Sequence, residues 1–264
     1  MWYALGAAAA IIVLSGVLIG LKHWRDQLLF MDEIRQRGGI VNFEPIGPAW
    51  LRRHTTIKVQ AAYAAPYIVS LNEARFTDSD MTLLNGRTTP MLLALGKTQI
   101  TDAGLIHLRN RSNLQILTLW ETEITDSGLT HLSGLKNLRK LHLNGTKVTD
   151  AGLTHLKSLT NLEYLYVANT QVTDNGLRQF KGLTNLESVS LNGTKVTDAG
   201  LRHLTGLKNL TGLFLKDTAV TDAGLVHLKT LPNLECVDLT GTSVTEPGIE
   251  NLQKSLPPGC EIRR

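Results

Sequence analysis

The chain has 264 residues, with 27 Lys and Arg against 23 Asp and Glu, and a formal net charge of +4. Nucleic-acid-binding proteins concentrate positive charge on one face, whereas the basic runs here are only doublets such as Arg52-Arg53, so no nucleic-acid partner is predicted. Cys236 and Cys260 are too few for a disulfide framework and lack the spacing of a zinc site, which leaves their redox state open.

The N-terminal segment from Trp2 to Leu21 contains no charged side chain. About twenty apolar residues in a helix cover the ~30 Å hydrocarbon core of a bilayer, so residues 1–22 are predicted to be an uncleaved transmembrane helix of a single-pass membrane protein. A cleaved signal peptide is the alternative, but no basic residue precedes the apolar stretch. Lys22 and Arg25 follow the span, and by the positive-inside rule this favours a cytoplasmic repeat domain. The rule is weak for long soluble domains, so the side of the membrane on which the repeat domain lies stays open.

Residues 23–65 are predicted to form a linker and an N-terminal cap. Apolar residues fall at helical spacing over residues 24–37, and Gly38-Gly39 ends this predicted helix. Residues 40–43 (IVNF) then have the composition of a short strand. The first repeat of an array needs such a cover for its exposed core.

A 24-residue period fills residues 66–264. The pair Thr-Asp begins at positions 77, 101, 125, 149, 173, 197 and 221, and Thr-Glu at 245 continues the series. Each unit contains L-x-x-L-x-L-x-x-T, in which the alternation of L-x-L predicts a strand with leucines inward. The following T-D-A-G-L-x-H-L predicts a short helix, with Thr149 as an N-cap and Asp150 favoured by the helix dipole.

These predicted elements define an α/β solenoid with a parallel concave sheet and short convex helices, preceded by one membrane helix. Gly134, Gly182 and Gly206 stand where the helices are expected to end. The first unit is degraded, and the last strand is shifted by one residue around residues 260–262. Atypical end units are expected because they cap the array.

The repeat pattern over about residues 66–263 resembles the leucine-rich-repeat family, with Thr in place of the commoner terminal Asn or Cys. It looks most like short bacterial proteins that have one N-terminal membrane helix, a helix-Gly-Gly-strand cap and T-x-V-T-D-A-G-L-x-H-L repeats. That resemblance implies architecture far more than function. The repeats are also similar to those of F-box substrate receptors, but no F-box-like segment precedes residue 66, so that function is not carried over.

Several rows of identical residues recur once per unit. Histidines stand at 107, 131, 155, 203 and 227, and aspartates at 102, 126, 150, 174, 198 and 222. A metal needs ligands that converge on one point, which a row along a solenoid does not provide. Repetition also explains the Asn and Thr rows, through bonds to turn backbone and to backbone between coils. We therefore predict no metal, no cofactor, no catalytic residues, no small-molecule substrate and no enzymatic activity.

Positions that differ between units are the candidates for function. The outward strand positions vary most, and they gather aromatic and basic side chains of the kind that forms binding hot spots. The predicted partner-binding residues are Trp120, Lys140, His142, Tyr164, Tyr166, Phe214 and Lys216. Random drift on a solvated face is the competing explanation. A second, apolar patch of Ile68, Leu92 and Ile116 is explained by a covering cap.

The predicted function is a membrane-anchored protein–protein interaction scaffold that binds its partner on the concave face. The first alternative is binding of a carbohydrate or cell-envelope polymer by the same face, and the second is a spacer without a specific ligand. The sequence leaves open which partner binds and which oligomeric state the protein adopts.

Overall fold

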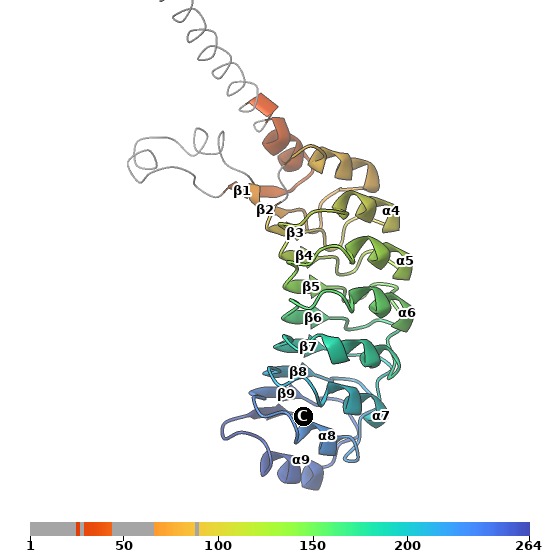
Figure 1. The fold of residues 1–264 in the computed structure, drawn as a ribbon, viewed down its shortest axis with the longest axis vertical. Helices are drawn as coiled ribbons and strands as arrows, with labels where there is room; N and C mark the ends of the chain where they lie inside the picture. The colour runs from red at the N-terminus through yellow and green to blue at the C-terminus, as the bar shows by residue number, and fades with distance from the viewer. Residues whose placement is uncertain (1–24, 27–28, 44–65, 88–89) are drawn as a thin grey trace, which may run out of the picture.

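The computed structural model of the chain describes residues 25–26, 29–43, 66–87 and 90–264. Within these residues, ten strands form one sheet in the order β1 to β10 (Figure 1). The strands are β1 (Ile40–Phe43), β2 (Pro66–Ser70), β3 (Leu92–Ala94), β4 (Ile116–Thr118), β5 (Lys140–His142), β6 (Tyr164–Tyr166), β7 (Ser188–Ser190), β8 (Gly212–Phe214), β9 (Cys236–Asp238) and β10 (Glu261–Arg263).

The predicted parallel sheet is confirmed from β2 to β10. Neighbouring strands pair residues that stand one repeat apart in the sequence, as Ile116 with Lys140. The last pair joins Cys236 to Glu261, one position beyond the repeat period, and this confirms the predicted shift. Strand β1 is antiparallel to β2 and covers the first edge of the parallel sheet.

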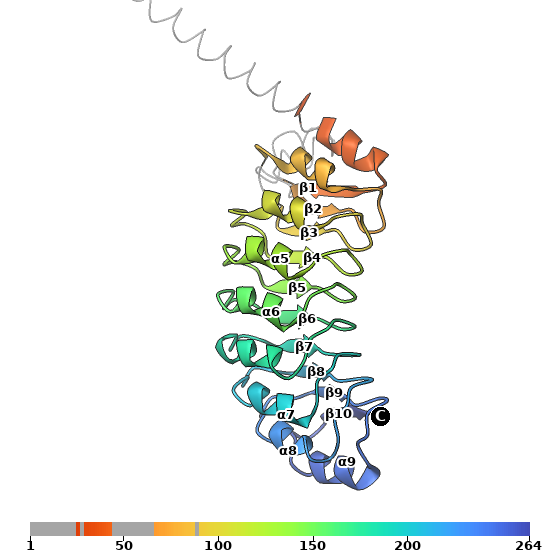
Figure 2. The same ribbon diagram turned by 90° about the vertical axis from the view of Figure 1, so that its right-hand side faces the viewer.

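Short helices run along the opposite side of the solenoid (Figures 1 and 2). Four of them begin as one α-helical turn and continue as a 3₁₀ turn, labelled η. The helical segments are η1 (Asp78–Leu84), α4 (Asp102–Leu105), η2 (Ile106–Leu108), α5 (Asp126–Leu129), η3 (Thr130–Leu132), α6 (Asp150–Leu153), η4 (Thr154–Leu156), η5 (Gly176–Gly182), α7 (Asp198–Leu201), η6 (Arg202–Leu204), α8 (Leu225–Leu228) and α9 (Glu246–Gln253). The predicted N-cap is confirmed, because Thr149 Oγ1 accepts a hydrogen bond from Ala151 N at 3.2 Å.

The expectation for the helix-ending glycines is confirmed at Gly182, where helix η5 ends, but not at Gly134. Helix η3 ends at Leu132, and Ser133 beyond it stays right-handed, so Gly134 is not a left-handed helix end. The left-handed glycines of the repeats instead lie in the turn after the strand, as Gly145 does with φ +68°. In the cap the expectation holds: residues 29–36 are helical, and Gly38 follows with φ +86°.

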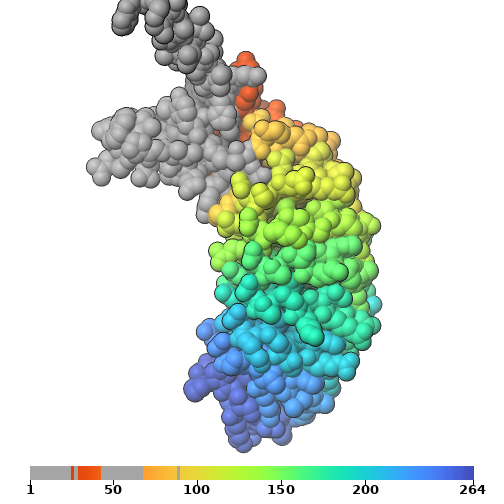
Figure 3. All heavy atoms as spheres, viewed as in Figure 1, coloured from red at the N-terminus to blue at the C-terminus, as the bar shows by residue number. Residues whose placement is uncertain are grey.

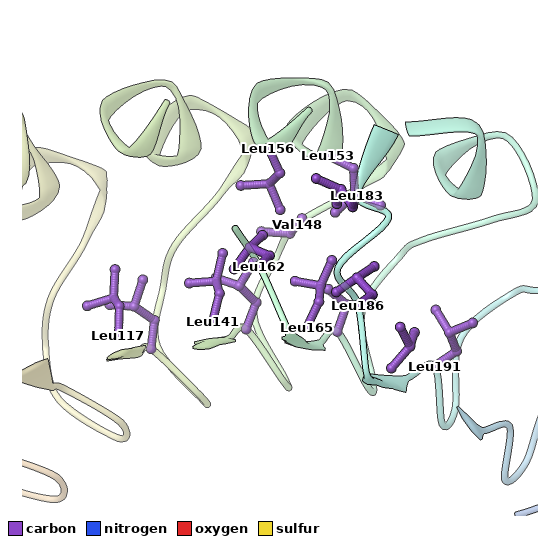
Figure 4. Packing of buried hydrophobic residues seen from close by; sticks show 14 of the residues in the cluster. Leu117, Leu141, Val148, Leu153, Leu156, Leu162, Leu165, Leu183, Leu186 and Leu191 are labelled. Atoms are coloured by element: carbon purple, nitrogen blue, oxygen red, sulfur yellow. The ribbon is translucent and has the colours of Figure 1, made fainter. Parts of the chain in front are cut away.

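The hydrophobic core is one continuous column between the sheet and the helices. Figure 4 shows Leu117, Leu141 and Leu165 side by side above their strands, with Leu153 and Leu156 facing them from the helical side. All five are 0–1% exposed. Burying each leucine contributes about 1.5–3 kcal/mol, so each coil is stabilised by stacking on its neighbours. In the space-filling view each coil is a band on the one before (Figure 3).

The Asp row joins consecutive coils. Asp150 Oδ1 accepts a hydrogen bond from Thr173 N at 2.7 Å, and Oδ2 accepts one from Thr173 Oγ1 at 2.6 Å. We call this pair of bonds the Asp–Thr contact. It recurs between Asp78 and Thr101, Asp102 and Thr125, Asp126 and Thr149, Asp174 and Thr197, Asp198 and Thr221, and Asp222 and Thr245. The sequence pattern indicated the helix-start position of these aspartates but not this bond between coils.

The side chains of two other polar rows also form hydrogen bonds to the backbone. The buried threonine row was expected to link coils, and this is wrong: Thr122 Oγ1 donates to Leu119 O of its own coil at 2.6 Å. The asparagine row does reach turn backbone, as predicted, but in the preceding coil. Asn137 Nδ2 donates to Ser112 O at 2.8 Å. Both rows are therefore scaffold.

The predicted membrane helix at residues 1–22 lies outside the described residues. Among the residues that are described, no helix has the length and apolar character needed to cross a bilayer.

Candidate binding surface on the concave face

Four of the predicted site residues form one contiguous group on β5 and β6. The strand register places Lys140 opposite Tyr164 and His142 opposite Tyr166. The Lys140 Nζ lies 4.0 Å from the centroid of the Tyr164 ring, a cation–π contact. The His142 and Tyr166 rings meet edge to face, with centroids 4.6 Å apart at 67°. We call these four residues the concave aromatic group.

The two tyrosine hydroxyls reach side chains at the start of the next strand and just before it. Tyr164 Oη donates to Glu187 Oε2 at 2.9 Å, and Tyr166 Oη hydrogen-bonds Ser188 Oγ at 3.3 Å. The rings therefore lean across the sheet toward β7, and they cover small residues there. Ser188 and Ser190 are each only 8% exposed. Outward alternation alone predicts that these serines are exposed, and their larger neighbours make that expectation wrong.

The electrostatics of the group leave one charged side chain at neutral pH. Burial, and secondly the charge of Lys140, lower the pKa of His142 below its usual value of 6.5, so the imidazole is neutral at pH 7. The hydrogen bond to Glu187 raises the pKa of Tyr164. Arg139, just before Lys140, is paired with Glu163. Among the described residues Lys140 has no carboxylate partner, so its ammonium is available to a bound molecule.

Trp120 lies beside the concave aromatic group and turns toward the preceding coil. A Cβ at Gly96 would come within 2.0 Å of Trp120 Nε1, so the indole lies directly over this glycine. The Lys97 Nζ is 5.0 Å from the Trp120 ring centroid. The half-buried indole thus packs on the scaffold of the neighbouring coil.

Phe214 and Lys216 lie on the other side of the group. Ser190 separates Phe214 from Tyr166 along the row of outward positions. The Phe214 ring folds back over its own strand, since a Cβ at Gly212 would be 3.4 Å from Phe214 Cε2. Lys216 is exposed in the turn beyond β8. The structure therefore divides the predicted site into a central group of four and two flanking parts.

The residues just before the strands also lie on this side of the molecule. The sequence pattern alone did not identify them as a candidate site. A polar groove of about 240 Å³ is lined by Gln115, Asn137, Arg139, Asn161, Glu163 and Asn185. A second groove of about 440 Å³ lies nearer the C-terminus and includes Glu187, Glu235 and Pro257. The recurrence of charged residues at this position, one arginine at 139 and glutamates at 163, 187 and 235, was the available signal.

The histidine row is half-buried on the helical side. Arg109 Nε donates to His131 Nδ1 at 3.0 Å, and burial followed by the charge of Arg109 lowers the pKa of His131. Within the described residues, no three His, Cys, Asp or Glu side chains group as metal ligands would. That these rows bind no metal stays a prediction.

Stacked coils of one strand and one short helix make this chain a solenoid, a class of protein that presents an extended face for binding. A family model of leucine-rich repeats in two copies matches residues 160–203, and a single leucine-rich repeat model matches residues 134–157. Together with the fold, these matches identify the chain as a leucine-rich-repeat protein. Leucine-rich-repeat domains in general mediate protein–protein interaction.

One solved structure with a similar fold is internalin C2 from Listeria monocytogenes. The identity is 25% and the TM-score 0.59, and the alignment covers 79% of this chain and 86% of that chain. A search of curated proteins found no match.

Proposed function

We propose that this protein is a membrane-anchored scaffold, without enzymatic activity, that binds a protein partner on the concave face. The concave aromatic group carries the proposal. Two tyrosines, a histidine and a lysine without a carboxylate partner among the described residues are half-exposed and form two contacting pairs on neighbouring strands. They stand where the repeats diverge from one another. Aromatic and basic side chains on a pre-formed rigid surface are the usual content of a binding hot spot.

The membrane part of the proposal rests on the uncharged segment from Trp2 to Leu21. A chain held at a bilayer meets membrane-bound partners at a high effective concentration, so a small concave surface suffices for specific binding.

Binding of a carbohydrate or cell-envelope polymer by the same residues is the second candidate. Both tyrosine hydroxyls are bonded to side chains at or just before β7, so the rings lean over the sheet and present their faces. Ring faces stack well on flat apolar surfaces, including those of sugars. A glycan array probed with the purified protein separates the two candidates, because saturable glycan binding that is lost on replacing the tyrosines supports the polymer.

The deciding variant is Tyr164→Ala/Tyr166→Ala. The partner is first captured by crosslinking from native membranes, and its affinity is then measured by titration. We expect the double variant to weaken binding by about 2 kcal/mol or more. The buried serines of β7 are unsuitable controls, whereas Cys236→Ala changes the outward position equivalent to Tyr164 three strands further on. Equal affinities for both variants would exclude the concave aromatic group as the binding surface.

A further inference from the structure

The helical side of the solenoid is far more basic than the sequence suggests. The six segments 103–113, 127–137, 151–161, 175–185, 199–209 and 223–233 contain nine Lys and Arg and no Asp or Glu. This excess is larger than the net charge of the whole chain, which is +4. We call these nine residues the convex cationic face: Arg109, Arg111, Lys136, Lys157, Arg178, Lys181, Arg202, Lys208 and Lys229.

These cations are available rather than paired. Across the described residues, none of the nine takes part in an ion pair, and seven of them are exposed. The guanidinium of Arg111 donates to the carbonyls of His107, Arg87 and Leu84. Four other members, Arg109, Lys136, Lys208 and Lys229, also donate hydrogen bonds, but none of their acceptors is a carboxylate. The one or two basic residues of each coil lie in its helix or in the turns that follow the helix, and these helices stack on one side of the solenoid (Figure 1).

The Asp row at the start of the same helices supplies six negative charges, so the nine cations outnumber these carboxylates by three. Each of these carboxylates accepts two hydrogen bonds in an Asp–Thr contact, which directs it at the next coil. The pKa of a neighbouring histidine indicates whether positive or negative charge dominates here. The pKa of His203 is lowered first by burial and then by the charges of Arg202 and Arg178, while Asp174 opposes these effects least. The local potential beside this histidine is therefore positive.

The surface chemistry favours a lipid bilayer as the bound partner. A protein partner is usually gripped by exposed aromatic anchors, and single-stranded nucleic acid by stacking platforms. Of Phe, Tyr and Trp, the six segments hold only Phe180, which is 1% exposed. The exposed apolar side chains, Ile106 and Val226, stand far apart near the two ends of the face. The ends of these segments help to line the two described grooves, but none of the nine basic residues lines either groove.

We propose that the convex cationic face binds the phosphate-bearing headgroups of an anionic bilayer. Basic residues spread over a surface without a groove gain from a diffuse negative charge, and each one within about 8 Å of the headgroups is attracted at physiological salt. This face is opposite the sheet, so the contact leaves the concave aromatic group open. The inference is independent of the proposed partner binding.

The test follows lysine reactivity in the full-length chain bound to vesicles. The protein is treated with an amine-acetylating reagent in phosphatidylcholine vesicles, with or without about 30 mol% phosphatidylglycerol, and modified sites are quantified by mass spectrometry. We expect Lys136, Lys157 and Lys181 to react several-fold more slowly with the anionic vesicles only. Lys147, which pairs with Glu123, and Lys195 are exposed between the strands and the helices of their coils and serve as internal references. Raising salt to about 0.5 M should remove the protection.

A charge-reversal pair isolates the face from the N-terminal segment. In Arg178→Glu/Lys181→Glu, protection of Lys157 should fall by about fivefold or more, whereas Lys147→Glu/Lys195→Glu makes the same change in net charge and should keep it. Equal acetylation in the two kinds of vesicle overturns the proposal without any variant. Protection by double-stranded DNA or by an acidic peptide, but not by anionic vesicles, overturns it in favour of that partner.

Discussion

A glycine stands two residues after each Asp from position 102 to position 222, and the preceding coil explains it. A Cβ at Gly176 would lie 2.4 Å from Asp150 Oδ1, and the same approach recurs at Gly152, where Asp126 Oδ1 would be 2.3 Å away. The carboxylate that makes the Asp–Thr contact therefore fills the space that a larger residue would need. The motif T-D-x-G therefore reflects packing between two consecutive coils rather than the needs of one helix.

Replacing Gly176 by Ala should destabilise the protein by about 1–3 kcal/mol, because a side chain is forced into occupied space. Glycine-to-alanine changes in helices normally stabilise by about 0.5–1 kcal/mol, so the expected sign is reversed here. Urea unfolding measures the change. Gly206→Ala is the matched control, since nothing lies within 4 Å of its Cβ. The idea is lost if both variants are equally stable, or if removing Asp150 does not relieve the effect of Gly176→Ala.

The lowered pKa of His142 predicts how stability depends on pH. The folded state disfavours the imidazolium, so the unfolded chain binds more protons between the folded pKa and 6.5. This contribution to stability is fully present above pH 6.5 and is lost as the pH falls toward the folded pKa. Lowered pKa values at His131 and His203 act in the same direction.

The free energy of unfolding of the wild-type protein should therefore fall between pH 7 and pH 5, and less steeply in His142→Gln. Urea titrations at each pH measure both slopes. A wild-type stability that is constant or rises over this range would contradict the assignment.

The secondary structure was predictable because the pattern that specifies each element recurs eight times in the sequence. A constant repeat period with Leu at fixed places determines strand, turn and helix together, and even the offset at β10 was readable around residues 260–262. The pairing of β1 with β2 was not, because it joins segments of different pattern. The behaviour of Gly134 was missed because the helices end in right-handed turns that need no glycine.

The candidate site was predictable only in part. Alternation placed Lys140 and Tyr164 on the outward side, and the parallel register made them neighbours. The direction in which each long side chain leans depends on the size of the residue beside it, which is why Trp120 lies over Gly96. The convex cationic face forms no basic run in the sequence, because its members come from different repeats. They lie on one side of the molecule only after the chain coils.

For the molecule as a whole, the proposed anchor makes a clear prediction. The full-length chain should fractionate with membranes and resist a carbonate wash, since residues 2–21 are uncharged and long enough to span a bilayer. A chain that begins at Asp26 should be soluble, and salt should release whatever membrane association it retains. Recovery of the full-length protein in the soluble fraction, or a mature N-terminus beyond Leu21, would refute the anchor.

The Asp–Thr contact has a direction, because each coil offers a carboxylate to the coil after it and a threonine to the coil before it. A coil that is copied in the gene arrives with both halves of this connection. Duplication of one whole repeat therefore lengthens the array without redesign of any neighbour, and loss of one repeat shortens it as easily. The outward residues of a new coil are then free to change. The Asp–Thr contact therefore lets arrays of different length arise by duplication or loss of repeats, and each new array can present a different binding surface.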